Sequence, residues 1–355
     1  MRIAISGASG YIGQHLSSFL EGKGYDVIPL GRDLFKEDCF DELCRCVESC
    51  EVVINLAGAS INKRWTEAYK QELYDSRICV TRQLVHAINT RSVKLELFIS
   101  ASAVGYYPAF GEYDEYHDCR GMDFLARLCG VEASACSSGV RLVITRFGVV
   151  LSEDGGALKE MLRLQRFSRV SVVIGNGQQR FPWISLFDLC RSFGYIIRNR
   201  QMRGVVNLVS PDLITQKQLA HTLARADKIR RIIPLPKFFF RLKFGEGASF
   251  VTKGQTVHPS KLQESGFTYI YPTIEKLMNI TDHHTVPELD VKRYMGRWYE
   301  IARYENHFER GMTDVTATYT LLPDGKIRVE NEGYKGGVHK KATGRAKQPD
   351  PKNNP

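Results

Sequence analysis

The sequence predicts an α/β protein whose first part is a doubly wound parallel sheet, followed by a smaller region of antiparallel strands. Three observations carry this prediction. An apolar run at residues 3–5 leads directly into closely spaced glycines, and apolar runs then alternate with helix-like segments to about residue 210. After residue 287 the pattern changes to strand signals joined by turns. Strands spaced by helices are typical of parallel βαβ units.

The elements of the first part follow from periodicity, because helical segments repeat apolar residues every three or four positions and buried strands form short apolar runs. We expect strands at residues 2–5, 25–30, 50–56, 95–100, 141–147 and 205–209, and helices at 11–20, 65–89, 124–137, 186–198, 216–227 and 236–244. Residues 151–185 and 211–280 have a looser pattern, which predicts a small α/β substrate lobe. The boundaries expected are a cofactor-binding domain with this lobe at 1–280, a linker at 281–287 and the β-rich segment at 288–355.

The charge and the cysteine content of the chain limit which kinds of partner and compartment are expected. The 355 residues carry a net charge of +10, and nine cysteines lie between Cys39 and Cys190. Their odd number is typical of reduced thiols, and the sequence shows no leader segment and no apolar run long enough to span a membrane. These features predict a cytoplasmic protein without stable membrane insertion. Cys39, Cys44, Cys46 and Cys50 lack the paired spacing of zinc knuckles, so no metal site is expected. Basic runs are interpreted as solvated helix faces, so no nucleic-acid partner is expected, whereas a homo-oligomer is compatible with the sequence.

The glycine-rich segment after the first strand predicts a dinucleotide site. Gly7 allows a tight turn, Gly10 lets the backbone approach a pyrophosphate, and Gly13 lets the next helix pack close to the sheet. The residues expected to contact the cofactor here are Gly7, Ser9, Gly10, Tyr11, Ile12 and Gly13. Leu56, Ala57 and Gly58, which follow the strand at 50–56, are expected to contact it as well.

The end of the second strand indicates which nicotinamide cofactor is bound. An NAD enzyme usually has a carboxylate there for the ribose 2′-hydroxyl, but Gly31 occupies that position and Arg32 follows. An arginine suits a 2′-phosphate, so the sequence favours NADP. Asp33 is the counterargument, because its carboxylate could reach the ribose.

Several motifs together resemble the extended short-chain dehydrogenase/reductase superfamily: GASGYIG at 7–13, VVINLAGA at 52–59 and ISASAVGYY at 99–107. The sequences GGAL at 155–158 and GNGQQRFPWISLFDL at 175–189, with a C-terminal segment ending in YPT at 271–273, resemble its sugar-nucleotide epimerase-like group more narrowly. This resemblance covers residues 1–280. It implies a Rossmann-type fold and an oxidoreductase or epimerase-like reaction.

The resemblance also implies a Ser-Tyr-Lys proton relay, which this chain keeps only in part. Ser102 falls at the serine position, but Phe124 and Leu128 occupy the tyrosine and lysine positions. Tyr106 and Tyr107, in the loop after Ser102, are the candidate replacements, and packing against substrate or cofactor is the alternative role for them.

Residues of one loop and the helix after it are expected to bind the substrate, and these are Gln179, Arg180, Trp183 and Asp188. The substrate is expected to be a small molecule, and a nucleotide-linked compound is one candidate. The alternative function is an NADP(H)-binding regulatory or sensor protein without turnover, which the missing tyrosine and lysine favour.

The segment at 290–311 resembles the opening of a bacterial lipocalin, with Gly296-x-Trp298 as its motif, and the match continues to Tyr334. A lipocalin barrel needs about eight strands to close, but this segment supplies about four. We therefore expect residues 288–355 to form a partial antiparallel sheet, either truncated or paired with another chain or with the first domain.

Overall fold

The computed structural model describes residues 1–91, 95–130, 139–280, 291–299 and 312–346. The chain divides into two compact units, Met1–Ile280 and Thr281–Pro355.

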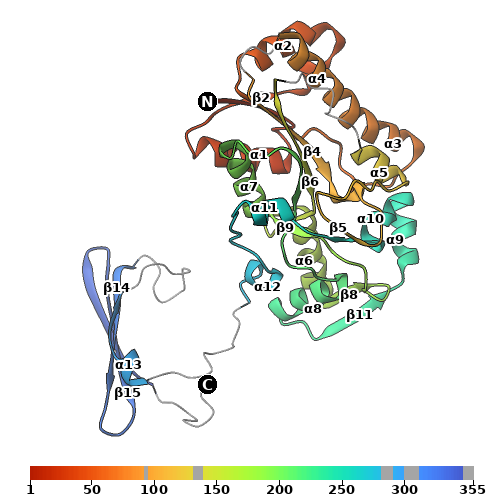
Figure 1. Ribbon diagram of the computed structural model, residues 1–355. Coiled ribbons are helices and arrows are strands. Elements are labelled where there is room, and N and C mark those ends of the chain that lie inside the picture. The colour runs from red at the N-terminus through yellow and green to blue at the C-terminus, as the bar shows by residue number, and fades with distance from the viewer. Residues whose placement is uncertain (92–94, 131–138, 281–290, 300–311, 347–355) are drawn as a thin grey trace. The chain divides into compact units, whose positions relative to one another are not determined.

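The first unit is built on a six-stranded sheet in which all neighbours run parallel (Figure 1). Its strand order is β10-β6-β4-β3-β1-β2, which puts β1 and β4 on either side of β3. The strands are β1 (Arg2–Ser6), β2 (Asp26–Leu30), β3 (Val52–Asn55), β4 (Leu97–Ala103), β6 (Arg141–Phe147) and β10 (Gly204–Leu208). The doubly wound parallel sheet expected from the sequence is confirmed.

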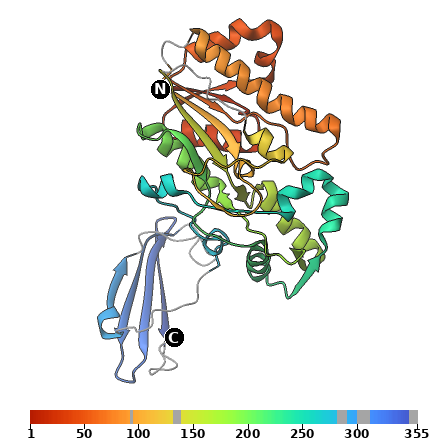
Figure 2. The same cartoon turned by 45° about the vertical axis from the view of Figure 1, so that its right-hand side comes forward.

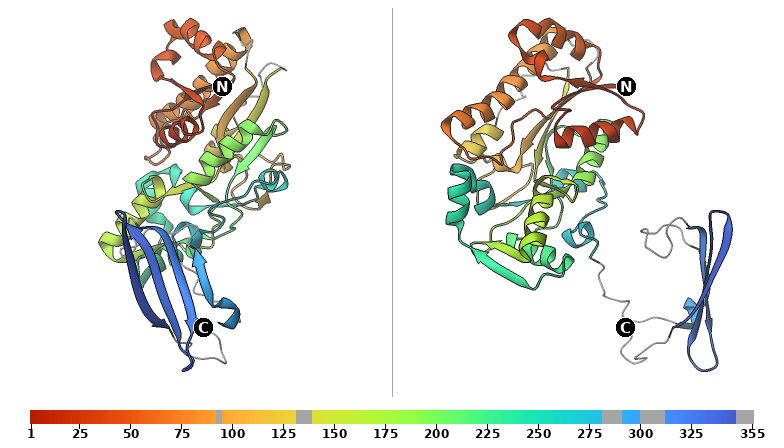
Figure 3. Two further views of the ribbon diagram at one scale, coloured as in Figure 1. Left: turned by 90° about the vertical axis from the view of Figure 1, so that its left-hand side faces the viewer. Right: turned by 180° about the vertical axis from the view of Figure 1, so that it is seen from behind.

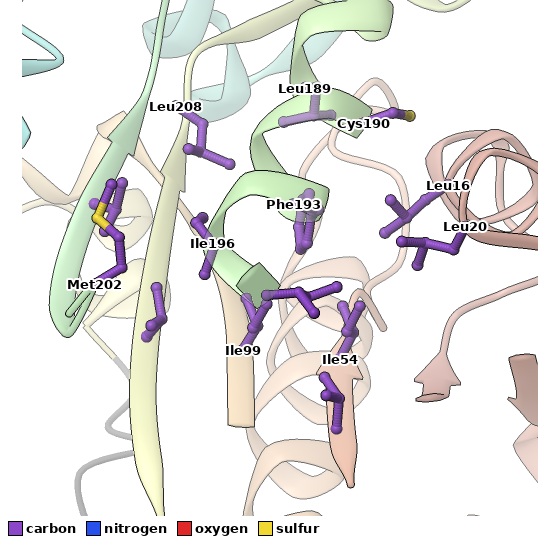
Figure 4. Close-up of a cluster of buried hydrophobic side chains, with 14 of the residues drawn as sticks. Leu16, Leu20, Ile54, Ile99, Leu189, Cys190, Phe193, Ile196, Met202 and Leu208 are labelled. Atoms are coloured by element: carbon purple, nitrogen blue, oxygen red, sulfur yellow. The ribbon is translucent and has the colours of Figure 1, made fainter. Parts of the chain in front are cut away.

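Helices cover both faces of this sheet. Helices α1 (Tyr11–Glu21) and α7 (Leu186–Arg198) lie side by side on one face, as Figure 3 shows from behind. Their apolar side chains pack with Ile54 and Ile99 of the sheet (Figure 4). Helices α2 (Phe40–Glu48) and α4 (Val80–Arg91) cover the other face. Burial of each large aliphatic side chain contributes about 1.5–3 kcal/mol, which holds the helices on the sheet.

The helical segment expected at 65–89 is divided in the structure. Helix α3 (Glu67–Tyr74) is joined to α4 by a π-helical turn at Asp75–Cys79. The Thr66 side chain caps α3 by accepting a hydrogen bond from the backbone N–H of Tyr69. A π-helical turn widens the helix, and such turns are frequent at functional sites. Here it places Arg77 toward the end of β3.

Outside the six-stranded sheet, the first unit contains three short parallel strand pairs and several helices. The pairs are β7 (Val149–Ser152) with β9 (Trp183–Ser185), β8 (Val170–Ile174) with β11 (Arg231–Leu235), and β5 (Glu112–Tyr113) with β12 (Thr256–Val257). The helices are α6 (Gly156–Ser168), α8 (Gln216–Ala226), α9 (Lys237–Phe244), α10 (Ser249–Thr252), α11 (Ser260–Glu264) and α12 (Ile274–Leu277).

One further helix, α5 (Phe124–Cys129), follows the loop after β4. It begins at Asp123, whose side chain accepts a hydrogen bond from the N–H of Ala126. The helix expected at 124–137 therefore ends at Cys129 in the described part, and residues 131–138 lie outside it. The linker expected at 281–287 also lies outside the described residues.

The second unit contains an antiparallel sheet in the order β13-β14-β15-β16, whose strands lie side by side in Figure 2. Its elements are α13 (Val291–Tyr294), β13 (Gly296–Tyr299), β14 (Met312–Leu321), β15 (Ile327–Lys335) and β16 (Val338–Ala346). The expected antiparallel sheet is thereby confirmed. Across both units, none of the helices in the described part is long and apolar enough to cross a lipid bilayer.

Candidate functional site

The carboxyl ends of β1, β3, β4 and β6 lie at one edge of the sheet, where open α/β sheets bind their ligands. Strand register aligns these ends. Ser6 pairs with Asn55, Asn55 with Ser100, and Ser102 with Arg146. The glycine-rich turn, the turn at Leu56 and the Ser102 loop therefore leave the sheet next to one another.

The glycine-rich turn has the close packing that a dinucleotide site needs. Gly7 has a φ of +74°, and a Cβ on it would lie 2.8 Å from the carbonyl carbon of Leu56. A Cβ on Gly13 would lie 2.2 Å from the carbonyl oxygen of Gly7, so no larger residue fits there. Helix α1 starts after Gly10 with no side-chain cap and no acidic residue in its first turn. Its N-terminus is therefore suited to a ligand phosphate.

The other residues predicted around this turn lie close to it. Ser9 is exposed, while Ile12 and Tyr11 are half-buried. The Tyr11 ring fills the space above Gly155, where an added Cβ would lie 2.3 Å from a ring carbon. The Tyr11 hydroxyl is buried and has no hydrogen-bond partner among the described residues. This hydroxyl thus lies against Gly155 without a described partner.

The turn after β3 is held by side-chain hydrogen bonds. The Ser6 hydroxyl donates to the Asn55 amide oxygen at 2.6 Å, and the Ala57 N–H donates to the same oxygen at 3.2 Å. The Arg77 guanidinium lies directly against Gly58, where an added Cβ would be 2.8 Å from its Cζ atom. Arg77 donates to the carbonyl oxygen of Ala59 at 2.8 Å. Burial lowers the pKa of Arg77, but a guanidinium keeps its charge in proteins.

The residues after β2 leave room for a cofactor ribose. Apart from its chain neighbours, nothing lies within 4 Å of a Cβ built on Gly31, and Arg32 is exposed. The Arg32 side chain makes no hydrogen bond or ion pair with another described residue. Asp33 instead pairs with Lys36 at 2.5 Å, and this hydrogen bond holds the pKa of the Asp33 carboxyl below its usual value.

Ser102 lies at the end of β4 and is half-buried. Its hydroxyl donates to the carbonyl oxygen of Cys129, the last residue of α5, at 2.8 Å. Ser102 is on the same sheet face as Phe98, because residues two apart along a strand share a face. The hydroxyl oxygen keeps its lone pairs for a ligand, and rotation about the Cβ–Oγ bond would redirect its proton.

The tyrosine and lysine positions of the superfamily are part of a small apolar cluster. Leu128 is 4% exposed and packs with Trp65 and Leu73. Phe124 contacts the Trp65 ring edge-on, with centroids 5.5 Å apart. A cavity of about 450 Å³ lies beside these rings, and Arg241 and Lys253 are among its polar lining residues. Its volume falls within the range of small-molecule sites.

Tyr106 and Tyr107 have different surroundings. Tyr107 is 2% exposed, and its hydroxyl faces the Asp114 carbonyl oxygen at 2.8 Å and the Asn207 amide oxygen at 3.0 Å. Tyr106 is half-buried and donates to Asp118 at 3.1 Å. Burial raises the pKa of both phenols, so both stay protonated at neutral pH. Of the two, Tyr106 has the more accessible hydroxyl.

The four residues predicted to bind substrate are mostly buried or hydrogen-bonded within the first unit. Trp183 is fully buried within an apolar cluster. Asp188 is also fully buried and accepts hydrogen bonds from the N–H groups of Ile270 and Tyr271, at 2.9 and 2.8 Å. Gln179 donates to two backbone carbonyls, and the exposed Arg180 donates to another. Their part in substrate binding stays a prediction.

Two arginines near this edge were not identified from the sequence. Arg77 lies against the Gly58 turn, and Arg146 lies over the Tyr106 ring, with its Cζ 3.6 Å from the ring centroid. The signal for Arg146 was a charged residue near the carboxyl end of a mainly apolar strand. Arg77 had no comparable signal, because it lies in a polar stretch of helix.

Comparison with known protein families shows which family the chain belongs to. Residues 3–208, more than half of the chain, match the sequence profile of the NAD dependent epimerase/dehydratase family. The chain belongs to this family. Residues 235–279 of this epimerase/dehydratase family member match a domain of unknown function, and residues 289–355 match a lipocalin-like domain. The resemblances to both families are thereby confirmed.

Relatives of similar length exist in bacteria and plants. The chain is 34% identical to Epimerase family protein YfhF of Bacillus subtilis over 307 residues, which cover 81% of this chain and 100% of that protein. It is 32% identical to the chloroplastic Epimerase family protein SDR39U1 homolog of Arabidopsis thaliana, covering 78% of this chain and 85% of that protein.

Solved structures agree with this assignment. The human epimerase family protein SDR39U1, crystallised with NADPH, aligns with a TM-score of 0.71 and 31% identity over 78% of this chain and 98% of that one. UDP-glucuronic acid 4-epimerase from Bacillus cereus, in complex with UDP-glucuronic acid and NAD, aligns with a TM-score of 0.59 and 19% identity, over 78% of this chain and 96% of that one. At that identity the second likeness concerns the fold alone.

Proposed function

We propose that the protein is an NADP(H)-dependent oxidoreductase or epimerase-like enzyme that acts on a small-molecule substrate. The observation that carries the cofactor assignment is the end of β2, where Gly31 leaves open space beside the exposed Arg32. A guanidinium there suits a 2′-phosphate, and Asp33 is engaged by Lys36. The NADPH named with the human relative supports the same cofactor.

The chain's own residues suggest how the reaction would be assisted. NADPH, when bound, supplies a hydride from C4 of its nicotinamide. Ser102 would turn its hydroxyl from the Cys129 carbonyl to the substrate oxygen and stabilise charge on it. Tyr106 would supply the proton, because its phenol is protonated and Phe124 has none to give. Arg77 would hold the Gly58 turn against the cofactor.

A second function is an NADP(H) sensor that regulates a partner without turnover. The observation that favours it is the packing of Phe124 and Leu128 into the apolar cluster, because no conventional proton relay can form there. The two proposals share the cofactor and differ only in whether hydride leaves it.

One experiment separates the two functions. The full chain is incubated with NADPH and a panel of aldehydes, ketones and keto acids, and absorbance at 340 nm reports oxidation of the cofactor. Catalytic oxidation that depends on protein and is lost in Ser102→Ala supports the enzyme. Tight stoichiometric NADPH binding with no oxidation across the panel, and no conversion of nucleotide sugars by NMR, supports the sensor.

A further inference from the structure

Arg146 is a buried cation that forms no ion pair with any described residue. It lies near the end of β6 and is 6% exposed. Its Cζ lies 3.6 Å from the ring centroid of Tyr106 and 4.7 Å from that of Tyr107. Its Nε is buried and lacks a hydrogen-bond partner, and no carboxylate among the described residues forms an ion pair with it.

The groups around Arg146 do not neutralise it. Tyrosine faces offset part of the cost of burying a cation, but buried charges are normally paired with an opposite charge. Burial raises the pKa of the Cys129 thiol to about 11, so this neighbour is neutral. The carboxylate of Asp118 is exposed and accepts a hydrogen bond from Tyr106 rather than from Arg146. No carboxylate among the described residues therefore offsets the charge of Arg146.

The sheet places Arg146 beside the reacting position and away from the phosphate-binding turn. Ser102 and Arg146 are register partners on adjacent parallel strands, so they share a face about 4.8 Å apart at the backbone. Strand β1, which leads into the phosphate-binding turn, lies three strands from β6. Three strand spacings amount to about 14 Å. The cofactor pyrophosphate at that turn therefore lies too far away to pair with Arg146.

We propose that Arg146 binds a carboxylate of the substrate, next to the carbon whose oxygen Ser102 contacts. This inference rests on the proposed enzyme function and narrows its substrate class to hydroxy acids or keto acids. The short spacing between Ser102 and Arg146 requires the carboxylate to lie within a few bonds of the reacting carbon. A guanidinium can pair with a planar carboxylate through two parallel hydrogen bonds, which fixes the orientation of the substrate.

Binding of oxamate tests this inference without requiring turnover. Oxamate carries a carboxylate next to an unreactive carbonyl, and oxamide is its neutral analogue. Calorimetry and thermal unfolding of the NADPH-loaded full chain, at constant ionic strength, should show binding and stabilisation by oxamate but not by oxamide. Absence of this difference, or tighter binding of inorganic phosphate than of oxamate, overturns the assignment.

Two variants test whether Arg146 is the residue that binds oxamate. Arg146→Met should weaken oxamate binding by roughly 10- to 100-fold, the loss expected for a charge-assisted hydrogen bond, while NADPH affinity stays unchanged. Its melting temperature should not fall, because the substitution removes an unpaired buried charge. The control Arg120→Met removes one positive charge from an exposed position in the preceding loop and should leave oxamate binding intact.

Other outcomes of these variants contradict the inference. Equal loss of oxamate binding in both variants would mean that only net charge matters. Weakened NADPH binding in Arg146→Met would mean that Arg146 serves the cofactor. If Arg146→Met does not fold, the comparison of oxamate with oxamide on the wild-type protein still tests whether binding requires a carboxylate. Failure of the proposed function is recognised separately, by absence of NADPH binding or of hydride transfer.

Discussion

Single side chains distinguish this site from a conventional relay of its superfamily. Phe124 has no ionisable proton to donate and Leu128 has no charge. The structure nevertheless brings other polar groups to the same edge of the sheet. Arg77 lies against Gly58, and Arg146 is the register partner of Ser102. Positive charge is therefore supplied from helix α3's π-helical extension and from β6, rather than from the helix that follows β4.

Selectivity for NADP should depend on Arg32. Arg32→Ala removes the expected partner of the 2′-phosphate and leaves the glycine-rich turn intact. We expect NADP affinity to fall by about 10- to 100-fold, the loss of a charge-assisted hydrogen bond, and NAD affinity to stay constant. Calorimetric titration of both cofactors measures this. Arg163→Ala, which removes an exposed arginine on α6, is the control, and equal affinities of the wild type for the two cofactors would contradict the prediction.

Ser102 should affect turnover rather than cofactor binding. Loss of one hydrogen bond to a charged oxygen in a water-poor site lowers kcat by roughly 100-fold. Ser102→Ala should show this loss with any substrate the panel identifies, while NADPH affinity by calorimetry matches the wild type. An unaltered kcat would remove Ser102 from the reaction.

At the scale of elements, the sequence predicts the regular parts well. The strand expected at 141–147 is β6 and the helix expected at 186–198 is α7, because both have clear apolar patterns and end signals. The helix at 65–89 is interrupted by the π-helical turn at Asp75–Cys79, which periodicity does not reveal. The burial of Arg146 could not be predicted either, because it depends on the fold of the tyrosine loop above it.

The packing of α5 predicts that the conventional relay cannot simply be restored. Leu128 is 4% exposed within an apolar cluster, so Leu128→Lys introduces a buried charge without a partner. We expect the free energy of unfolding to fall by about 3–5 kcal/mol. Phe124→Tyr alone, at a half-buried position, should be nearly neutral. Chemical denaturation of both variants tests this, and a Leu128→Lys protein as stable as the wild type would contradict it.

At the scale of the whole molecule, the two units have very different cores. The first unit buries a sheet between two helical layers, whereas the described part of the second is one antiparallel sheet with the short helix α13. Large side chains of the second sheet are exposed, with Trp298 at 49% and Tyr299 at 69%. Within the described residues β13 and β16 are edge strands, which leave backbone groups unpaired. The lipocalin-like sequence therefore predicts the partial antiparallel sheet but not a closed ligand cavity.

The second unit should accordingly be dispensable for cofactor binding and should not bind apolar ligands by itself. A sheet with one open face buries too little apolar surface to offset backbone ordering, which costs about 1–2 kcal/mol per residue. We expect a chain limited to residues 1–280 to bind NADPH as tightly as the full protein, because all of the predicted cofactor residues lie within that range. Limited proteolysis should cut the second unit first. Calorimetry on both chains measures the NADPH affinities, and an isolated, protease-resistant second unit that binds fatty acid stoichiometrically would contradict the prediction.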